Sequence, residues 1–250
     1  MKVVLFSGTT EGRMLSHALA ACGIAVKVCV ATEYGREEQG TAEGIAVECG
    51  RKDIQAMCDT IAGADLCVDA THPYATQVTE NIRIACEESA VPYRRLLRPK
   101  SQLEAGEILV KSAAQAADYL AQREGNILLT TGAKEIAAYA GIPVERLFPR
   151  ILPMHAGLTA CEEMKIPRRN IIAMQGPFSV ELNEALLRQY QIRYLVTKDG
   201  GKTGGFEEKV CAAHRTGATL IVIARPEEHD GASLEEILQE CKERQKCRYI

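Results

Sequence analysis

Glycine-rich and polar stretches follow short apolar runs at several points in this chain of 250 residues. The first stretch is Gly8–Arg13 (GTTEGR), which stands between the apolar run Val3–Phe6 and a helical pattern. A glycine after a buried strand lets the backbone turn sharply, and the following helix presents amide N–H groups and the positive end of its dipole. The glycine spacing departs from the GxGxxG fingerprint of dinucleotide-binding proteins. The segment predicts a pyrophosphate site, and a capped turn without a ligand is the alternative.

Residues expected to bind a dinucleotide lie in this stretch and just after the second apolar run, Val26–Val30. They are Gly8, Thr9, Thr10, Glu11, Gly12, Arg13, Thr32 and Glu33. Glu33 stands about twenty residues beyond Gly12, where dinucleotide folds place the residue that faces the adenosine ribose. A carboxylate there accepts from a 2′-hydroxyl and repels a 2′-phosphate, so Glu33 favours NADH, whereas Arg36 could accommodate NADPH. A Glu33 that simply faces solvent is the alternative.

The stretch Asp69–Tyr74 (DATHPY) carries an imidazole and a phenol close together. Either group can donate a proton or bind a carboxylate, so His72 and Tyr74 are candidate catalytic proton donors. Pro73 between them restricts the backbone. A structural role for the histidine is an equally open interpretation.

Two further stretches in the second half of the chain indicate anion binding. The segment from Thr197 (TKDGGKTGG) does not match the Walker motif GxxxxGK[ST]. Lys198 and Lys202 supply charge there and the glycines expose amides, which is typical of an anion-binding loop ahead of a helix from Phe206. The stretch Gly176–Ser179 precedes another helix, which Ser179 is expected to cap.

The elements that position these stretches are short buried strands alternating with helices. The runs that predict strands are Val3–Phe6, Val26–Val30, Leu66–Val68, Ile127–Leu129, Ile171–Met174, Tyr194–Val196 and Leu220–Ile223. This alternation predicts an α/β fold with parallel sheets, whose ligands bind where the strands end. A polar break at Arg98–Gln102 predicts two Rossmann-like lobes facing a central cleft, residues 1–98 forming the dinucleotide-binding lobe and residues 99–250 the second lobe.

Composition restricts the classes of partner. The net charge of −3 argues against nucleic acid or an anionic membrane, and no apolar run is long enough to span a bilayer. Ten cysteines are scattered without CxxC spacing, which favours reduced packing thiols in a reducing cytoplasm over disulfides or a metal site. No protein-bound metal is expected.

Six motifs in this order and spacing resemble those of the precorrin-6A reductases of cobalamin biosynthesis. They are GTTEGR at Gly8–Arg13, ATEYG at Ala31–Gly35, DATHPYA at Asp69–Ala75, LLTTG at Leu128–Gly132, AMQGPFS at Ala173–Ser179 and VTKDGGKTGG at Val196–Gly205. The resemblance runs essentially end to end. It implies an oxidoreductase that passes a hydride from NADH or NADPH to a double bond of precorrin-6A, or of its cobalt complex, to give the 6B product. ATEYG and the thiol content are closer to the anaerobic branch, which uses cobalt-precorrin-6A and NADH.

The resemblance also implies where the tetrapyrrole binds, and the second lobe would carry most of the site. The implied residues are His72, Pro73, Tyr74, Thr131, Gly132, Gly176, Pro177, Phe178, Ser179, Lys198, Gly200, Gly201, Lys202, Gly204 and Gly205, with Arg225 as a further cation. The enzyme is expected to be a cytoplasmic monomer or homodimer. The alternatives are a dinucleotide-binding redox sensor without catalytic activity and a cofactor-free two-lobed tetrapyrrole enzyme.

Overall fold

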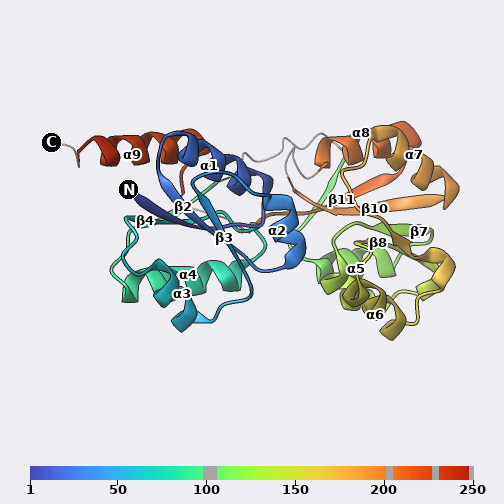
Figure 1. The fold of residues 1–250 in the computed structure, drawn as a ribbon. Helices are drawn as coiled ribbons and strands as arrows, with labels where there is room; N and C mark the ends of the chain where they lie inside the picture. The colour runs from blue at the N-terminus through green and yellow to red at the C-terminus, as the bar shows by residue number, and fades with distance from the viewer. Residues whose placement is uncertain (98–105, 201–204, 227–230, 248–250) are drawn as a thin grey trace. The chain divides into compact units, whose positions relative to one another are not determined.

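Two parallel β-sheets organise the chain (Figure 1). The computed structural model describes residues 1–97, 106–200, 205–226 and 231–247. Contacts divide the chain into a first unit, Met1–Arg98 with Glu227–Ile250, and a second unit, Pro99–Pro226. The prediction of an α/β fold with two parallel sheets is confirmed.

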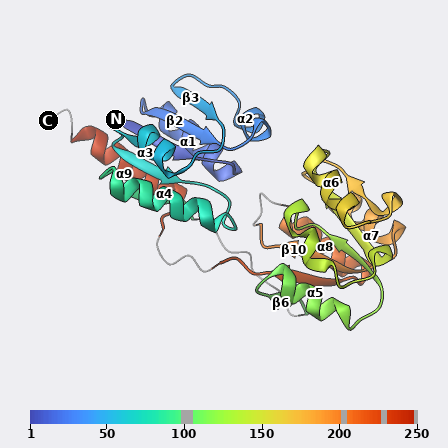
Figure 2. The ribbon, with the colours of Figure 1, turned by 90° about the horizontal axis from the view of Figure 1, so that it is seen from below.

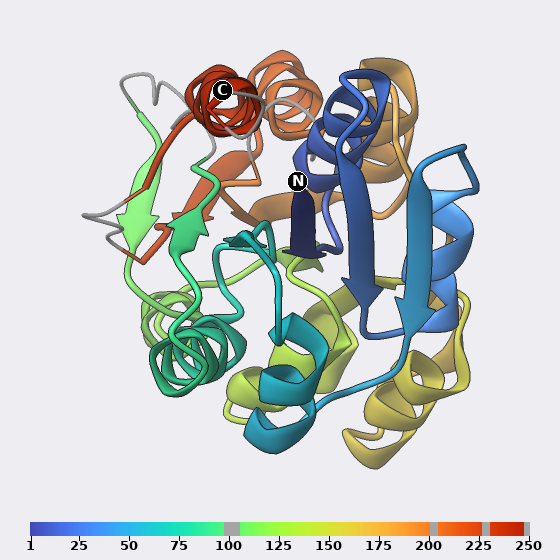
Figure 3. The same cartoon turned by 60° about the vertical axis from the view of Figure 1, so that its left-hand side comes forward.

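The first unit contains a five-stranded sheet in the order β3-β2-β1-β4-β5, with parallel pairing throughout. Its strands are β1 Lys2–Phe6, β2 Ala25–Val30, β3 Ile45–Cys49, β4 Leu66–Asp69 and β5 Tyr93–Arg95. Its helices are α1 Thr10–Ala21, α2 Glu33–Gln39, α3 Ile54–Ile61, α4 Thr76–Glu88 and α9 Leu234–Lys246. Helices α1 and α9 cover one face of the sheet, and α3 and α4 cover the other (Figure 3).

Strand β1 shows why this sheet reads as continuous apolar runs in the sequence. Successive side chains of a strand point to opposite faces. Val3 and Leu5 pack into the core under α1 and α9, whereas Val4 and Phe6 pack into the core under α3 and α4. Both faces are buried from Val3 to Phe6, so each of these four positions is apolar, and only the exposed first residue, Lys2, is charged.

The second unit contains a six-stranded sheet in the order β6-β11-β10-β7-β8-β9, again with parallel pairing. Its strands are β6 Ile108–Val110, β7 Asn126–Leu129, β8 Leu147–Ile151, β9 Ile172–Ala173, β10 Ile192–Lys198 and β11 Thr219–Ile223. Its α-helices are α5 Ala113–Ala121, α6 His155–Glu163, α7 Val180–Gln189 and α8 Phe206–Thr216, and its 3-10 helices are η1 Ala133–Tyr139, η2 Val144–Arg146 and η3 Arg168–Asn170. Helices α7 and α8 pack together on one face, and α5 and α6 lie on the other (Figures 1 and 2).

The expected extent of the second lobe, 99–250, is wrong at its C-terminal end. Helix α9 belongs to the first unit, because Ile237 and Cys241 pack into the same core as Leu15. The chain re-enters that unit beside β5, where the Ala232 N–H donates to the Arg95 carbonyl (2.9 Å). The return of the chain from the second unit to the first could not be predicted, because in the sequence this segment resembles any loop that precedes a helix.

All seven predicted strands are present, and their ends differ from the predicted ones by at most two residues. Strands β3, β5, β6 and β8 were not predicted. Strand β8 contains Pro149, which is unusual inside a central strand, and the charged Arg150, which interrupts its apolar run. The other three are short or only partly buried, so their apolar signal is weak.

Candidate functional site

The loops that were predicted from the sequence to bind ligands lie where strands end. In the first unit they follow β1, β2 and β4, and the sheet order β2-β1-β4 makes these strands neighbours. In the second unit they follow β7, β9 and β10. In parallel sheets, the edge at which the strands end is the edge at which ligands bind. Each unit therefore gathers its three predicted stretches at its own ligand-binding edge.

The turn after β1 has the backbone conformation and the space that a pyrophosphate requires. Gly8 has φ of +147°, a conformation that residues with a side chain rarely adopt. A Cβ at Gly8 would have no heavy atom within 4 Å, so the backbone is open on that side. Helix α1 begins two residues later, and the first amides of a helix have no partner within it. The chain at this turn fits the close approach of a phosphate group.

Gly12 brings α1 against the sheet. A Cβ at this position would lie 2.5 Å from Ser7 Oγ and 2.9 Å from the Ala70 Cβ, so only glycine fits. The Gly12 N–H donates to Thr9 Oγ1 (3.1 Å), and the Thr9 hydroxyl donates to the Ala70 carbonyl (2.8 Å). Thr9 therefore caps α1 and also ties the glycine turn to the loop after β4.

The other predicted cofactor residues have local partners. Thr32 caps α2 by accepting from the Gly35 N–H (3.1 Å). Glu33 forms an ion pair with Arg36 (3.5 Å), and both side chains are exposed. The Arg13 guanidinium donates to the Glu38 carbonyl (2.9 Å) and so links α1 to α2.

Thr10 and Glu11 form the start of α1. The Glu11 carboxylate interacts favourably with the helix dipole in this first turn. This negative charge would compete with an incoming phosphate for the positive end of the α1 dipole. The geometry therefore gives no favourable contact between the Glu11 side chain and a phosphate.

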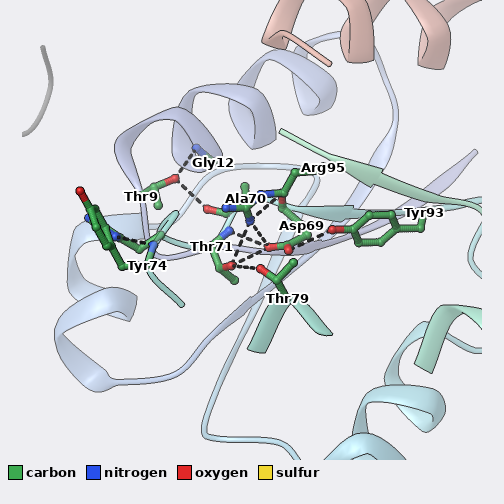
Figure 4. Close-up of polar contacts among 10 residues, drawn as sticks. Thr9, Gly12, Asp69, Ala70, Thr71, Tyr74, Thr79, Tyr93 and Arg95 are labelled. Atoms are coloured by element: carbon green, nitrogen blue, oxygen red, sulfur yellow. Dashed lines mark hydrogen bonds and ion pairs between the residues drawn. The ribbon is translucent and has the colours of Figure 1, made fainter. Parts of the chain in front are cut away.

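A buried polar network supports the loop that carries His72 and Tyr74 (Figure 4). Asp69, fully buried at the end of β4, forms an ion pair with the equally buried Arg95 of β5 (2.7 Å). Asp69 Oδ1 also accepts from the Thr71 N–H (2.9 Å) and the Thr71 hydroxyl (2.7 Å). The Tyr93 hydroxyl donates to Asp69 Oδ2 (3.2 Å). Burial, together with the Asp69 charge, raises the pKa of Tyr93, so this phenol stays a donor.

This network could not be predicted from the sequence, because Asp69, Tyr93 and Arg95 meet only through the pairing of β4 with β5. The network holds Thr71, and His72 and Tyr74 follow directly. The rings of His72 and Tyr74 lie 5.4 Å apart, and the Tyr74 N–H donates to His72 Nδ1 (3.4 Å). Pro73 is buried between them. The structure thus brings the two predicted proton donors together on one anchored loop.

The loops after β7 and β10 are joined by an ion pair. Lys198, the last residue of β10, lies 2.5 Å from Glu135 of η1. Gly132, at the start of η1, has φ of +89° and open space at its Cβ position, and Thr131 beside it is buried. The Lys198 ammonium group therefore has a carboxylate beside it, and its role in binding the tetrapyrrole stays a prediction.

Arg225, which the resemblance implies as a further cation for the tetrapyrrole, is also paired with a carboxylate. Its guanidinium lies 3.0 Å from Asp199 Oδ1 and donates to the Asp199 carbonyl (2.8 Å), and both side chains are largely buried. Gly200 follows Asp199, and Gly205 starts α8 in the left-handed conformation. The predicted residues Gly201, Lys202 and Gly204 lie outside the described residues.

The loop Gly176–Ser179 is held by the helix that follows it. Ser179 caps α7 as predicted, because its hydroxyl accepts from the Leu182 N–H (3.3 Å). The buried Asn183 amide donates to the carbonyls of Phe178 (3.3 Å) and Ser179 (2.8 Å). The Gly176–Pro177 peptide bond is cis, and a Cβ at Gly176 would lie 2.9 Å from the Phe178 ring.

In the described ranges of the chain, no group of three or more His, Cys, Asp or Glu side chains could hold a metal ion. None of the described helices has both the length and the apolar character needed to cross a bilayer.

These features define an α/β protein with two parallel sheets. The first sheet carries a glycine turn that leads into a helix, and this turn is suited to bind a nucleotide. The family model of the precorrin-6x reductases (CbiJ/CobK) matches residues 2–242, and the chain belongs to this family of oxidoreductases.

Similar proteins agree with this membership. The chain is 35% identical to the cobalt-precorrin-6A reductase of Priestia megaterium over 231 residues, which are 90% of each chain. It is 35% identical to that of Salmonella typhimurium over 230 residues, covering 90% of this chain and 87% of the relative. A solved structure titled CobK precorrin-6A reductase superposes with a TM-score of 0.77 over 97% of both chains at 22% identity, which supports the fold.

Proposed function

We propose that the protein reduces one macrocycle double bond of cobalt-precorrin-6A, giving cobalt-precorrin-6B, with reduced nicotinamide as the hydride donor. The observation that carries the proposal is the glycine turn after β1, open at Gly8, in a chain of this reductase family. Two relatives with 35% identity are named for the cobalt substrate, which supports the cobalt-containing branch. The ten free thiols favour a reducing cytoplasm as the location.

The first unit would bind the dinucleotide at its ligand-binding edge. The amides of the Gly8 turn and of the start of α1 would bind the pyrophosphate. The exposed Glu33 would accept from the ribose hydroxyls. Its ion pair with Arg36 keeps a cation beside the position that a 2′-phosphate would occupy, but the carboxylate favours NADH. When bound, the nicotinamide supplies the hydride.

The remaining residues would orient the macrocycle and deliver a proton. Addition across a carbon–carbon double bond requires one proton for each hydride. We assign this proton to the loop after β4, from the Tyr74 hydroxyl or the His72 imidazole. The Asp69–Arg95 pair would hold this loop in place, which makes the two residues positioning residues. The loops of the second unit would bind the carboxylates of the macrocycle.

An anaerobic assay with NADH or NADPH, each with cobalt-loaded or metal-free precorrin-6A, tests the proposal. We expect nicotinamide oxidation that depends on the tetrapyrrole, with the highest kcat/KM for NADH and the cobalt substrate. Glu33→Gln should raise the relative use of NADPH, and Arg36→Ala should lower it. Oxidation independent of any tetrapyrrole would reject the reaction. A preference for NADPH would reject only the cofactor assignment.

Lys198→Ala is expected to raise the KM for the tetrapyrrole about tenfold, with little change in the KM for the nicotinamide. The substitution removes a cation and leaves Glu135 to repel substrate carboxylates. Glu135→Gln is the matched variant and should lower the same KM, because it removes a negative charge that competes with the substrate carboxylates for the ammonium group. Steady-state kinetics with each ligand varied in turn measures both effects. Equal changes in the two Michaelis constants would place Lys198 away from the tetrapyrrole.

A further inference from the structure

Arg150, in β8, is a buried cation without an acidic partner. The residue is 7% exposed. Its Nη1 donates to Asn183 Oδ1 (2.8 Å), and its guanidinium carbon lies 3.9 Å from the centroid of the Phe178 ring. Both neighbours are neutral. Within the described residues, no carboxylate forms an ion pair with this guanidinium.

Lys209 adds a second buried positive charge nearby. It lies in α8 and is 8% exposed. Burial and the Arg150 charge lower the pKa of Lys209 to about 8, and Glu208 acts in the opposite direction. Burial alone lowers the pKa of Arg150 to about 10. Both groups therefore lie where their charged forms are disfavoured. A bound anion would favour the charged forms and so raise both pKa values again.

The position of the pair matches that of a ligand site. Arg150 stands one residue before the end of β8, and Phe178 lies in the loop after β9. Lys209 lies near the start of the helix that follows the loop after β10. All three residues are thus near the edge of the second sheet at which its strands end, where parallel sheets bind ligands. A buried charge is strongly unfavourable unless it is paired, so a cation at this edge without a carboxylate partner is suited to an incoming anion.

We propose that Arg150 and Lys209 bind one carboxylate of the macrocycle. This inference rests on the proposed function for the identity of the ligand. The planar guanidinium can donate two parallel hydrogen bonds to a carboxylate, and the ammonium group supplies a further donor. Asn183 orients the guanidinium through Nη1, and Phe178 stacks on it. The absence of a side chain at Gly176 leaves room for that ring.

Binding of uroporphyrin III, a fluorescent tetrapyrrole with eight carboxylates, tests the site without the reductase reaction. The variants are Arg150→Gln, Arg150→Lys and Lys209→Met, and Arg123→Gln is the matched control. Arg123 belongs to the same unit and also stacks on an aromatic ring, Tyr119 (3.5 Å), but it precedes β7 and so lies near the opposite edge of the sheet. Fluorescence anisotropy gives the dissociation constant, and thermal melts followed by circular dichroism show whether each variant is folded.

We expect Arg150→Gln and Lys209→Met to raise the dissociation constant about tenfold or more, the effect of losing a charge-assisted hydrogen bond. Arg150→Lys should retain part of the affinity, and Arg123→Gln should bind as the unsubstituted protein does. Equal binding by all folded variants, or no binding by the unsubstituted protein, would overturn the site. Suppose that the variants lose porphyrin binding although the unsubstituted protein shows no tetrapyrrole-dependent nicotinamide oxidation. That combination of results would support the carboxylate site and reject the reductase reaction. If the protein is an active reductase and all variants bind the porphyrin equally, the reaction would be supported and the carboxylate site rejected.

Discussion

Replacing Gly8 by valine is expected to abolish dinucleotide binding while the protein remains folded. Gly8 has φ of +147°, which costs a β-branched residue about 1–3 kcal/mol. The new side chain would occupy the open space beside the turn, where the pyrophosphate is expected to approach the backbone. Titration of reduced nicotinamide fluorescence measures the loss, and circular dichroism measures the fold.

Gly63→Val is the matched control for this substitution. Gly63 also has a positive φ and open space at its Cβ position, but it lies in the turn before β4, at the other edge of the same sheet. This variant should lose a similar amount of stability and bind the cofactor normally. A Gly8→Val protein with normal affinity for the nicotinamide would show that the cofactor binds elsewhere.

Arg95→Met is expected to destabilise the protein by about 3–5 kcal/mol, because it leaves the Asp69 carboxylate buried without its counter-charge. Urea denaturation followed by circular dichroism measures the change in the free energy of unfolding. The double variant Asp69→Asn with Arg95→Met should be less destabilised than the sum of the two single variants, because neither charge remains.

Arg94→Met, one position earlier on the same strand, is the control. Its ion pair with Glu240 (2.9 Å) is partly exposed, and such pairs contribute about 1 kcal/mol or less. If Arg95→Met were as mild as Arg94→Met, the buried pair would not anchor the loop after β4. The kcat of the Arg95→Met reductase should also fall, because the loop that carries His72 and Tyr74 loses its support.

Strand-end motifs could be predicted because they are local. Gly8 allows the turn after β1, Thr9 caps α1 and Ser179 caps α7. Each of these roles depends on residues within a few positions along the chain. The alternation of apolar runs with helical patterns likewise indicates parallel sheets without reference to any distant contact. These features set the fold class and the loops at which ligands are expected to bind.

Charge compensation could not be predicted from the sequence. Lys198 and Arg225 are expected from the sequence to supply positive charge, and folding places the carboxylates of Glu135 and Asp199 beside them. Arg150 received no functional role from the sequence, because a lone arginine beside a proline in an unpredicted strand carries no local signal. Its burial without a carboxylate partner depends on β8, α7 and the loop before α7.

The amino-acid order alone determined where strands turn into helices and which of those turns contain glycine, because backbone freedom and capping act over a few residues. Tertiary structure alone decided which charges are neutralised, which are buried, and that the final helix returns to the first unit. Electrostatic pairing and burial depend on residues far apart in the chain, such as Asp69 with Arg95 and Leu15 with Ile237, and only the packed sheets bring these residues together.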